Sequence, residues 1–159
     1  MTRLSFLFVC TENICRSPLA EAMLRHALKR EGLHRRVRVG SAGTVVSVPR
    51  QRADPRAVAV AERFGVRMKP GRSRKLKPAD FARFDYILLM DRGHYRDSLS
   101  LCPPEFRHRM ALVMDYAPGF EGDEIPDPYF GSEEGFEVVF TLLDVAVEGI
   151  VAAVLEGRL

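Results

Sequence analysis

The feature that most constrains the fold is an apolar run near the start of the chain that ends at a cysteine. Residues 3–9 are mostly apolar, and residues 6–9 continuously so, which is typical of a strand buried on both faces of a parallel sheet. The run stops at Cys10. Further on, Ser17 and Pro18 predict a helix start, with a hydroxyl at the N-cap and proline at the first helical position. The sequence therefore predicts a tight loop joining a buried strand to a helix.

This loop carries a thiol and a guanidinium, on Cys10 and Arg16. Backbone N–H groups of a loop that enters a helix can turn inward and bind an oxyanion, helped by the positive end of the helix. Arg16 can add a planar, two-pronged donor to the same anion. The positive field favours the thiolate form of Cys10, which would then be a nucleophile aimed at phosphorus. The simpler alternative is a buried strand-end thiol beside an ordinary surface arginine.

Residues 9–21 read Val-Cys-Thr-Glu-Asn-Ile-Cys-Arg-Ser-Pro-Leu-Ala-Glu. This stretch resembles the opening signature of the low-molecular-weight protein tyrosine phosphatase family. The resemblance implies Cys10 as the nucleophile and Arg16 as the binder of the phosphoryl oxygens. It also implies that Asn13 shapes the loop and that Ser17 hydrogen-bonds the thiolate. The phosphate-binding residues that it implies are Thr11, Glu12, Asn13, Ile14, Cys15, Arg16 and Ser17.

Two residues of this loop carry expectations of their own. Glu12 stands where the family often has glycine. We expect its carboxylate to face solvent, because a carboxylate that points into an anion site is unfavourable. The family counterpart of Cys15 can form a reversible disulfide with the nucleophile, so the resemblance implies a redox role for Cys15. The alternative is a small buried thiol that packs the loop.

A second loop, residues 115–130, contains an aspartate with proline on both sides, Pro126-Asp127-Pro128. Hydrolysis of a phosphate ester needs a proton for the leaving oxygen, and the two prolines limit the backbone freedom around Asp127. In isolation an Asp-Pro pair indicates a turn. In the family, Asp-Pro-aromatic-aromatic-Gly holds the general acid and one wall of the substrate pocket. The resemblance thus implies Asp127 as the acid, with Tyr129 and Phe130 as that wall.

Further residues receive supporting roles by the same resemblance. Ser41 is implied to brace the phosphate loop through Asn13, and is otherwise a turn residue. Asp91 is implied to lie close to that loop, and it also suits the N-cap of the next helix. Where the family places a pocket aromatic, this chain has Ser47 or Val48. One wall of a phosphotyrosine slot is therefore expected to be missing.

Strand and helix signals alternate along the rest of the chain. Together with the resemblance, they predict an α/β three-layer sandwich with right-handed crossovers, in which a four-stranded parallel sheet of order 2-1-3-4 has helices on both faces. Nothing repeats and no linker interrupts the pattern, so we expect one domain spanning residues 1–159. The further strands are predicted at residues 37–39, 85–90 and 110–114, and helices are predicted to start at Asp54-Pro55, near Arg92 and at Ser132.

Residues 67–77 hold six lysines and arginines. The simpler interpretation is a solvated basic loop, and the sharper one is a basic patch that guides acidic or phosphorylated partners. The four histidines show no metal-ligand spacing, so we expect all of them to be ordinary. Neither a metal ion nor an organic cofactor is expected.

Composition narrows the range of partners. The 24 basic and 21 acidic residues give a net charge of +3, which is too mild to indicate nucleic acid but suits an anionic substrate. The three cysteines do not support a disulfide framework, and a functional thiol needs a reducing compartment. No apolar run of about 18 residues and no signal peptide is apparent, so we expect a cytoplasmic protein without a membrane partner. We expect a monomer that acts on a phosphotyrosine protein or peptide and releases inorganic phosphate.

Two other functions stay open at this point. An arsenate reductase on the same fold would use a matching thiolate loop but would pass oxidation to further cysteines, and Cys102 stands alone. A catalytically inert phosphoanion-binding module is the other, suggested by Glu12 and the missing aromatic. Hydrolysis of an aryl phosphate that vanishes in Cys10→Ser would separate the phosphatase from both.

Overall fold

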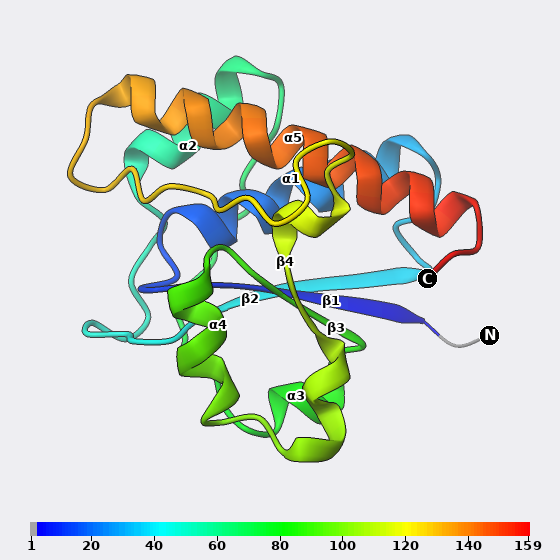
Figure 1. Cartoon of the computed structure of the whole chain (residues 1–159). Coiled ribbons are helices and arrows are strands. Elements are labelled where there is room, and N and C mark those ends of the chain that lie inside the picture. Colours follow the sequence, from blue (N-terminus) through cyan, green and yellow to red (C-terminus); the bar gives the residue numbers. More distant parts are fainter. Residues whose placement is uncertain (1–2) are drawn as a thin grey trace.

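The computed structural model describes residues 3–159, and a parallel sheet lies at its centre (Figure 1). Its strands are β1 (Leu4–Cys10), β2 (Val37–Gly43), β3 (Tyr86–Leu89) and β4 (Met110–Leu112). They run in the order β2-β1-β3-β4, and every neighbouring pair is parallel. The predicted fold class and strand order are therefore confirmed.

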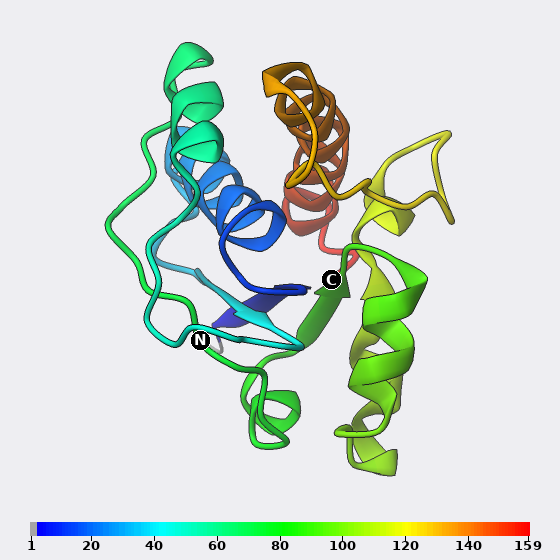
Figure 2. The ribbon, with the colours of Figure 1, turned by 90° about the vertical axis from the view of Figure 1, so that its left-hand side faces the viewer.

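Helices cover both faces of this sheet (Figures 1 and 2). On one face lie α1 (Arg16–Arg30), α2 (Pro55–Arg63) and α5 (Glu133–Leu155), and on the other lie α3 (Asp80–Arg83) and α4 (Arg92–Leu99). Two 3-10 helices, η1 (Pro104–Arg109) and η2 (Val113–Tyr116), flank β4. The carboxyl ends of β1 and β3 lead into α1 and α4, so both helices begin at the same edge of the sheet, where parallel α/β folds bind ligands.

The central strand explains why the sequence is continuously apolar there. Alternate side chains of a strand point to opposite faces. Phe6 and Phe8 accordingly belong to the core under α1, α2 and α5, whereas Leu7 and Val9 belong to a second core under α3 and α4. Because helices cover both faces, no position in this stretch is left for a polar side chain.

Three element boundaries differ most clearly from prediction, while β1 and β3 differ by one residue at each end. β2 continues to Gly43, and β4 stops at Leu112, where the Asp115 carboxylate accepts a hydrogen bond from the Leu112 amide at the start of η2. α1 begins at Arg16, with Cys15 as N-cap and no capping side chain. Ser17 is therefore not the N-cap, because its hydroxyl points to the sulfur of Cys10 instead.

α5 corrects the expectation that no segment has the length and composition of a membrane span, because only Asp144 and Glu148 are charged among residues 138–155. In this structure it is a core helix. One side of α5 is buried against α1, α2 and η2. At Gly149 the helix touches η2 so closely that a Cβ atom would overlap the carbonyl of Tyr116.

Candidate active site

The loop of residues 10–17, called here the phosphate loop, curls between β1 and α1 at the sheet's carboxyl edge. Asn13 adopts the left-handed conformation, with φ of +60°, which lets the chain reverse within a few residues. Neighbouring backbone holds the loop in place through three hydrogen bonds, from the amides of Thr44, Val45 and Asp54 to the carbonyls of Cys10, Thr11 and Ile14. The carbonyl side of the loop is therefore fixed by the protein.

The amide side of this loop is different. The N–H groups of residues 12–17 donate to no acceptor among residues 3–159. A run of unpartnered amides around a left-handed residue, at the start of a helix, forms a concave site for an anion. This arrangement fits the predicted phosphate-binding role of the loop.

A chain of side-chain hydrogen bonds ties the predicted nucleophile to its predicted supports. The sulfur of Cys10 lies 2.9 Å from Ser17 Oγ, which accepts a hydrogen bond from Asn13 Nδ2 at 2.8 Å. The same amide group donates to Ser41 Oγ at 2.9 Å, and Ser41 donates to Glu21 Oε1 at 2.6 Å. The structure thus brings together the four predicted residues and adds Glu21, which the sequence reasoning did not select.

Arg16 is 3% exposed and lies across the loop instead of in bulk solvent. Its Nη1 donates to Asp91 Oδ2 at 3.1 Å and to the carbonyl of Ile125 at 2.9 Å. Its Nη2 makes longer contacts, 3.5 Å to Thr11 Oγ1 and 3.6 Å to Asp127 Oδ2. One half of the guanidinium is therefore anchored, and the other half is available to phosphoryl oxygens.

His94 corrects the expectation that all four histidines are ordinary. It is buried against the phosphate loop, where its Nε2 lies 2.8 Å from Thr11 Oγ1 and 3.4 Å from Arg16 Nη2. Its Nδ1 is 3.2 Å from Asp91 Oδ1. The sequence held one signal for this placement, since His94 is three positions after the predicted cap Asp91, whose carboxylate accepts from the His94 amide.

The surroundings of His94 and Asp91 lower the pKa values of both. Burial and then the positive charge of Arg16 lower the pKa of His94, which favours the neutral ring near neutral pH. Burial raises the pKa of Asp91, but the His94 amide and the charges of His94 and Arg16 outweigh it, so that its pKa is lowered overall. Asp91 is therefore an anion that holds Arg16, and it is also the N-cap of α4, so both predicted roles coexist.

Asp127 lies at the mouth of the site, with about half of its side chain exposed. Its Oδ1 accepts a hydrogen bond from the Tyr129 amide at 3.0 Å, and its Oδ2 faces Arg16. Between proline neighbours, this local turn holds the carboxylate over the phosphate loop. Asp123 and Glu124 have no comparable contact with Arg16.

The predicted pocket residues lie at the rim, and they are not equally well held. Tyr129 packs near the Arg56 guanidinium, which donates to the Tyr129 carbonyl, whereas Phe130 is 95% exposed. Ser47 binds the carboxylate of Glu12 through its amide and its hydroxyl, at 2.8 and 2.7 Å. Glu12 is therefore half-buried and turned toward the neighbouring loop, and it does not simply extend into solvent as predicted. Val48 is exposed.

Cys15 belongs to the same loop, and its sulfur lies 3.8 Å from Asp54 Oδ2. Burial and the negative charge of Asp54 raise the pKa of Cys15 to about 12, so it is a neutral thiol near neutral pH. Cys102 is buried in the core under α4, its thiol directed to the Pro103 carbonyl. It therefore offers no second redox partner at the phosphate loop, as an arsenate reductase would need.

Gly43 is a residue that sequence reasoning treated only as part of a small-residue strand end. A Cβ atom here would overlap the carbonyl oxygen of Thr11 and would come within 3.1 Å of the Asn13 nitrogen. Only glycine lets the end of β2 approach the phosphate loop this closely.

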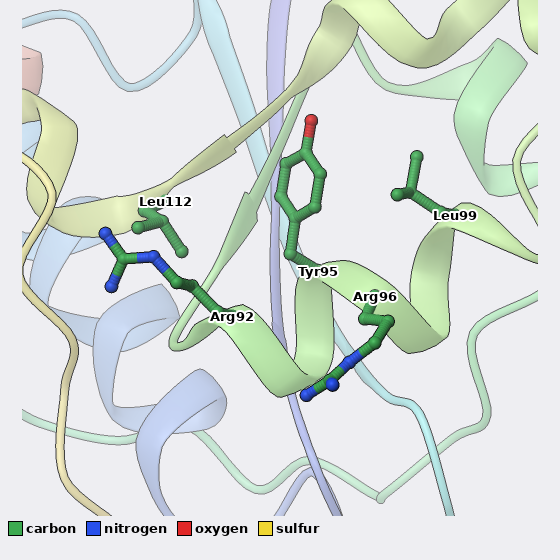
Figure 3. A pocket seen from close by; sticks show the side chains of 5 residues that line it. All are labelled: Arg92, Tyr95, Arg96, Leu99 and Leu112. Carbon is green, nitrogen blue, oxygen red and sulfur yellow. The ribbon is translucent and has the colours of Figure 1, made fainter.

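A hollow of about 570 Å³ between α4 and β4 is separate from this site. Its lining consists of Arg92, Tyr95, Arg96, Leu99 and Leu112 (Figure 3), none of which is a predicted site residue. No group of three or more metal-ligating side chains that could hold an ion occurs among residues 3–159.

Comparison with known proteins agrees with this geometry. The model of the family "Low molecular weight phosphotyrosine protein phosphatase" matches residues 5–158. The low molecular weight protein-tyrosine-phosphatase of Streptomyces coelicolor is 38% identical over 157 residues, which cover 95% of both chains.

Solved structures give the same result. A protein tyrosine phosphatase from Entamoeba histolytica superimposes with a TM-score of 0.92 at 35% identity, covering 98% of this chain and 99% of that one. YwlE, an arginine phosphatase known from Bacillus subtilis, superimposes with a TM-score of 0.87 at 27% identity, covering 98% of both chains.

Proposed function

Because this chain belongs to the low molecular weight phosphotyrosine protein phosphatase family, we propose that Cys10, Arg16 and Asp127 hydrolyse phosphotyrosine in two steps. In the first step the thiolate of Cys10 attacks phosphorus in line, so that an S–P bond forms as the P–O bond to the phenol breaks. The amides of the phosphate loop and Nη2 of Arg16 bind the equatorial oxygens. Asp127 gives its proton to the leaving phenolate oxygen.

The second step uses the carboxylate that the first step leaves behind. Asp127 takes a proton from a water molecule, whose oxygen attacks phosphorus as the S–P bond breaks. Inorganic phosphate leaves, the Cys10 thiolate is regenerated, and Asp127 is again protonated. No electron leaves the protein in this cycle, so it needs no further cysteine.

One observation carries this proposal: the sulfur of Cys10 lies in a loop whose amides at residues 12–17 have no protein acceptor, beside the buried Arg16. Unpartnered buried donors are costly unless an anion binds them. The loop therefore favours a group with several negatively charged oxygens directly above the nucleophile.

The substrate proposed is a phosphotyrosine in a protein or peptide, which the rim residue Tyr129 supports by offering an aromatic face. The arginine phosphatase on the same fold makes phosphoarginine the alternative that the assay must include. A thiolate nucleophile and three free cysteines suit a reducing compartment, and we propose that the enzyme acts in the cytoplasm.

The Cys10→Ser variant tests the chemistry, because a serine hydroxyl is not ionised at this site. We expect hydrolysis of p-nitrophenyl phosphate and of a phosphotyrosine peptide to fall by at least about 10⁴-fold, while calorimetry still detects binding of inorganic phosphate. Persistent turnover would remove Cys10 as nucleophile. Phosphate binding by the unaltered protein without turnover would indicate an inert module, and faster turnover of a phosphoarginine peptide would reassign the substrate.

A further inference from the structure

A second concave surface lies along the outer edge of β2, where Asn13 is the one residue of the phosphate loop that lines it. It is a groove of about 1180 Å³ between α1, the edge of β2 and residues 65–74, which follow α2. In Figure 2 this segment passes outside β2 (cyan), the last strand of the sheet on that side. We call it the basic groove.

The charge of the molecule is concentrated in this groove. Eight lysines and arginines and one acid, Glu21, are among the residues that line it, which gives a formal charge of +7. The whole chain has a charge of +3, so the rest of the chain carries −4. The two histidines in the lining add to this charge wherever they are protonated. The groove is therefore a positive surface on a molecule that is otherwise negative.

Some of these cations already have partners within the protein. Arg25 pairs with Glu21 at 2.9 Å, Arg74 pairs with Asp80 at 3.0 Å, and Arg38 lies over the ring of Phe84.

The other five are exposed and form no ion pair among residues 3–159, and three of them, Arg67, Lys69 and Arg72, belong to the segment that follows α2. All three stand on the outer wall, opposite β2. They are the cations that a partner would meet first.

The opposite wall offers unpaired backbone. Backbone groups point alternately to the two sides of a strand, and Gly43 uses its outward N–H and C=O to bind residues 74 and 76. The backbone groups of residues 36, 38, 40 and 42 pair with β1. The backbone N–H and C=O groups of Val37, Val39 and Ser41 therefore point outward, on the same side as those of Gly43. Their outward amides have no partner among residues 3–159, whereas the carbonyl of Val39 already accepts a hydrogen bond from Arg25. A further strand could therefore pair with the three amides and with the carbonyls of Val37 and Ser41.

We propose that the basic groove binds an extended acidic segment of a protein partner, which pairs with the edge of β2 while its carboxylates meet the cations of residues 67–72. Strand addition supplies main-chain hydrogen bonds, and the side chains that point outward supply charge complementarity. From Val37 to Ser41 the edge is about 13 Å long at 3.3 Å per residue, which suits a segment of about five residues.

A polypeptide fits this groove better than another polyanion. The edge of β2 presents the carbonyls of Val37 and Ser41 as well as their amides. A polyphosphate or a nucleic-acid backbone could bind the cations, but its phosphate groups have no N–H donors for these carbonyls. A peptide satisfies both.

Fluorescence anisotropy with three labelled eight-residue peptides tests the proposal on the full-length protein. Glu and Thr alternate in the first peptide, Lys replaces Glu in the second, and Pro replaces Thr in the third, which keeps the charge but removes alternate N–H groups. We expect only the first to bind well, with an affinity that falls as salt increases. None of these peptides carries a phosphoryl group, so the result does not depend on the proposed catalysis.

Two double variants with the same change of charge locate the site. Lys69→Glu with Arg72→Glu should weaken binding of the first peptide about tenfold or more, because each reversal replaces an attraction by a repulsion. Arg96→Glu with Arg107→Glu, on the opposite side of the molecule in α4 and η1, should change it less than about twofold.

Hydrogen exchange should show protection of the Ser41 amide when the first peptide is bound. If the two double variants lose affinity for the first peptide equally, the proposed site is wrong. Equal binding of the proline peptide would overturn strand addition, and tighter binding of polyphosphate at the same site would overturn a peptide as the ligand.

Discussion

The floor and the rim of the active site are built in opposite ways. At the floor Cys10, Arg16 and Ser17 are at most 3% exposed, and side chains from several elements hold them. At the rim Tyr129 is 43% exposed and Phe130 is 95% exposed. The difference predicts that the floor fixes the reaction and that the rim, where substitutions disturb little packing, selects the substrate.

Asp127 is an exception to this difference between floor and rim, because it lies at the rim but has a proposed chemical role. In Asp127→Asn we expect turnover of phenyl phosphate, a poor leaving group, to fall by ~10²–10⁴-fold. Turnover of 2,4-dinitrophenyl phosphate, whose phenolate needs no proton, should fall far less. Steady-state kinetics with both esters checks this, and an equal loss on both would remove the acid role.

The same substitution at the floor and at the rim measures the contrast directly. Arg16→Lys should lower kcat/KM by about 10²–10³-fold, because an ammonium cannot bind two oxygens in one plane while it also holds Asp91 and the Ile125 carbonyl. Arg56→Lys, under Tyr129, should lower it by less than about tenfold. Similar losses at the two arginines would show that the rim is as demanding as the floor.

Gly43→Ala tests whether the floor depends on the close approach of β2. The added methyl group would overlap the Thr11 carbonyl, so we expect a loss of ~1–3 kcal/mol in the free energy of unfolding, together with weaker phosphate binding. Gly71→Ala is the matched control, because the nearest atom to its Cβ would be 3.8 Å away. Denaturant unfolding of both variants measures this loss. If Gly43→Ala is as stable as the unaltered protein, the phosphate loop can shift to make room for the methyl group.

His94 adds a dependence on pH to the floor. Its pKa is lowered in the folded protein, so the unfolded chain binds the proton more readily, and stability should fall as pH drops below the ordinary value of about 6.5. In His94→Asn and His94→Gln this slope should be shallower by up to about 1.4 kcal/mol per pH unit. Urea unfolding between pH 5 and 7 measures it, and slopes equal to that of the unaltered protein would exclude this origin.

The smallest effect is expected at the outermost rim. Phe130 rests mainly on the ring of Tyr129, with ring centroids 5.0 Å apart. Phe130→Ala should therefore leave kcat for p-nitrophenyl phosphate unchanged and raise KM for a phosphotyrosine peptide about two- to fivefold. A large loss of kcat would place this ring in the chemistry.

Sequence reasoning reached most of the fold, because the signals are local and repeated. The continuous run at residues 6–9 requires cover on both faces of the sheet, and Asp54-Pro55 marks a helix start that the structure reproduces, with Asp54 accepting from the Arg56 amide. The spacing of Cys10 and Arg16 likewise places them in one loop. These patterns need no knowledge of distant residues.

The parts that were missed depend on contacts between segments far apart in the chain. Gly43 is decisive only because the Thr11 carbonyl lies against it, and His94 belongs to the site only because α4 starts beside the phosphate loop. The local pattern made Ser17 a helix cap, which was wrong, and its contact with Cys10 was predicted only through the resemblance to the family. The spacing of residue types along the chain does not predict contacts of this kind.

The chain of hydrogen bonds behind the nucleophile also has a direction. Ser41 gives its only hydroxyl proton to Glu21, so it must accept from Asn13, whose two amide protons are then both used. Ser17 accepts one of them, and its own proton is left to point to sulfur or to the Ala42 carbonyl. A carboxylate on the flank of α1 thus orients the protons of Ser41 and Asn13 and leaves the Ser17 hydroxyl free to donate to the sulfur once the proposed nucleophile is ionised.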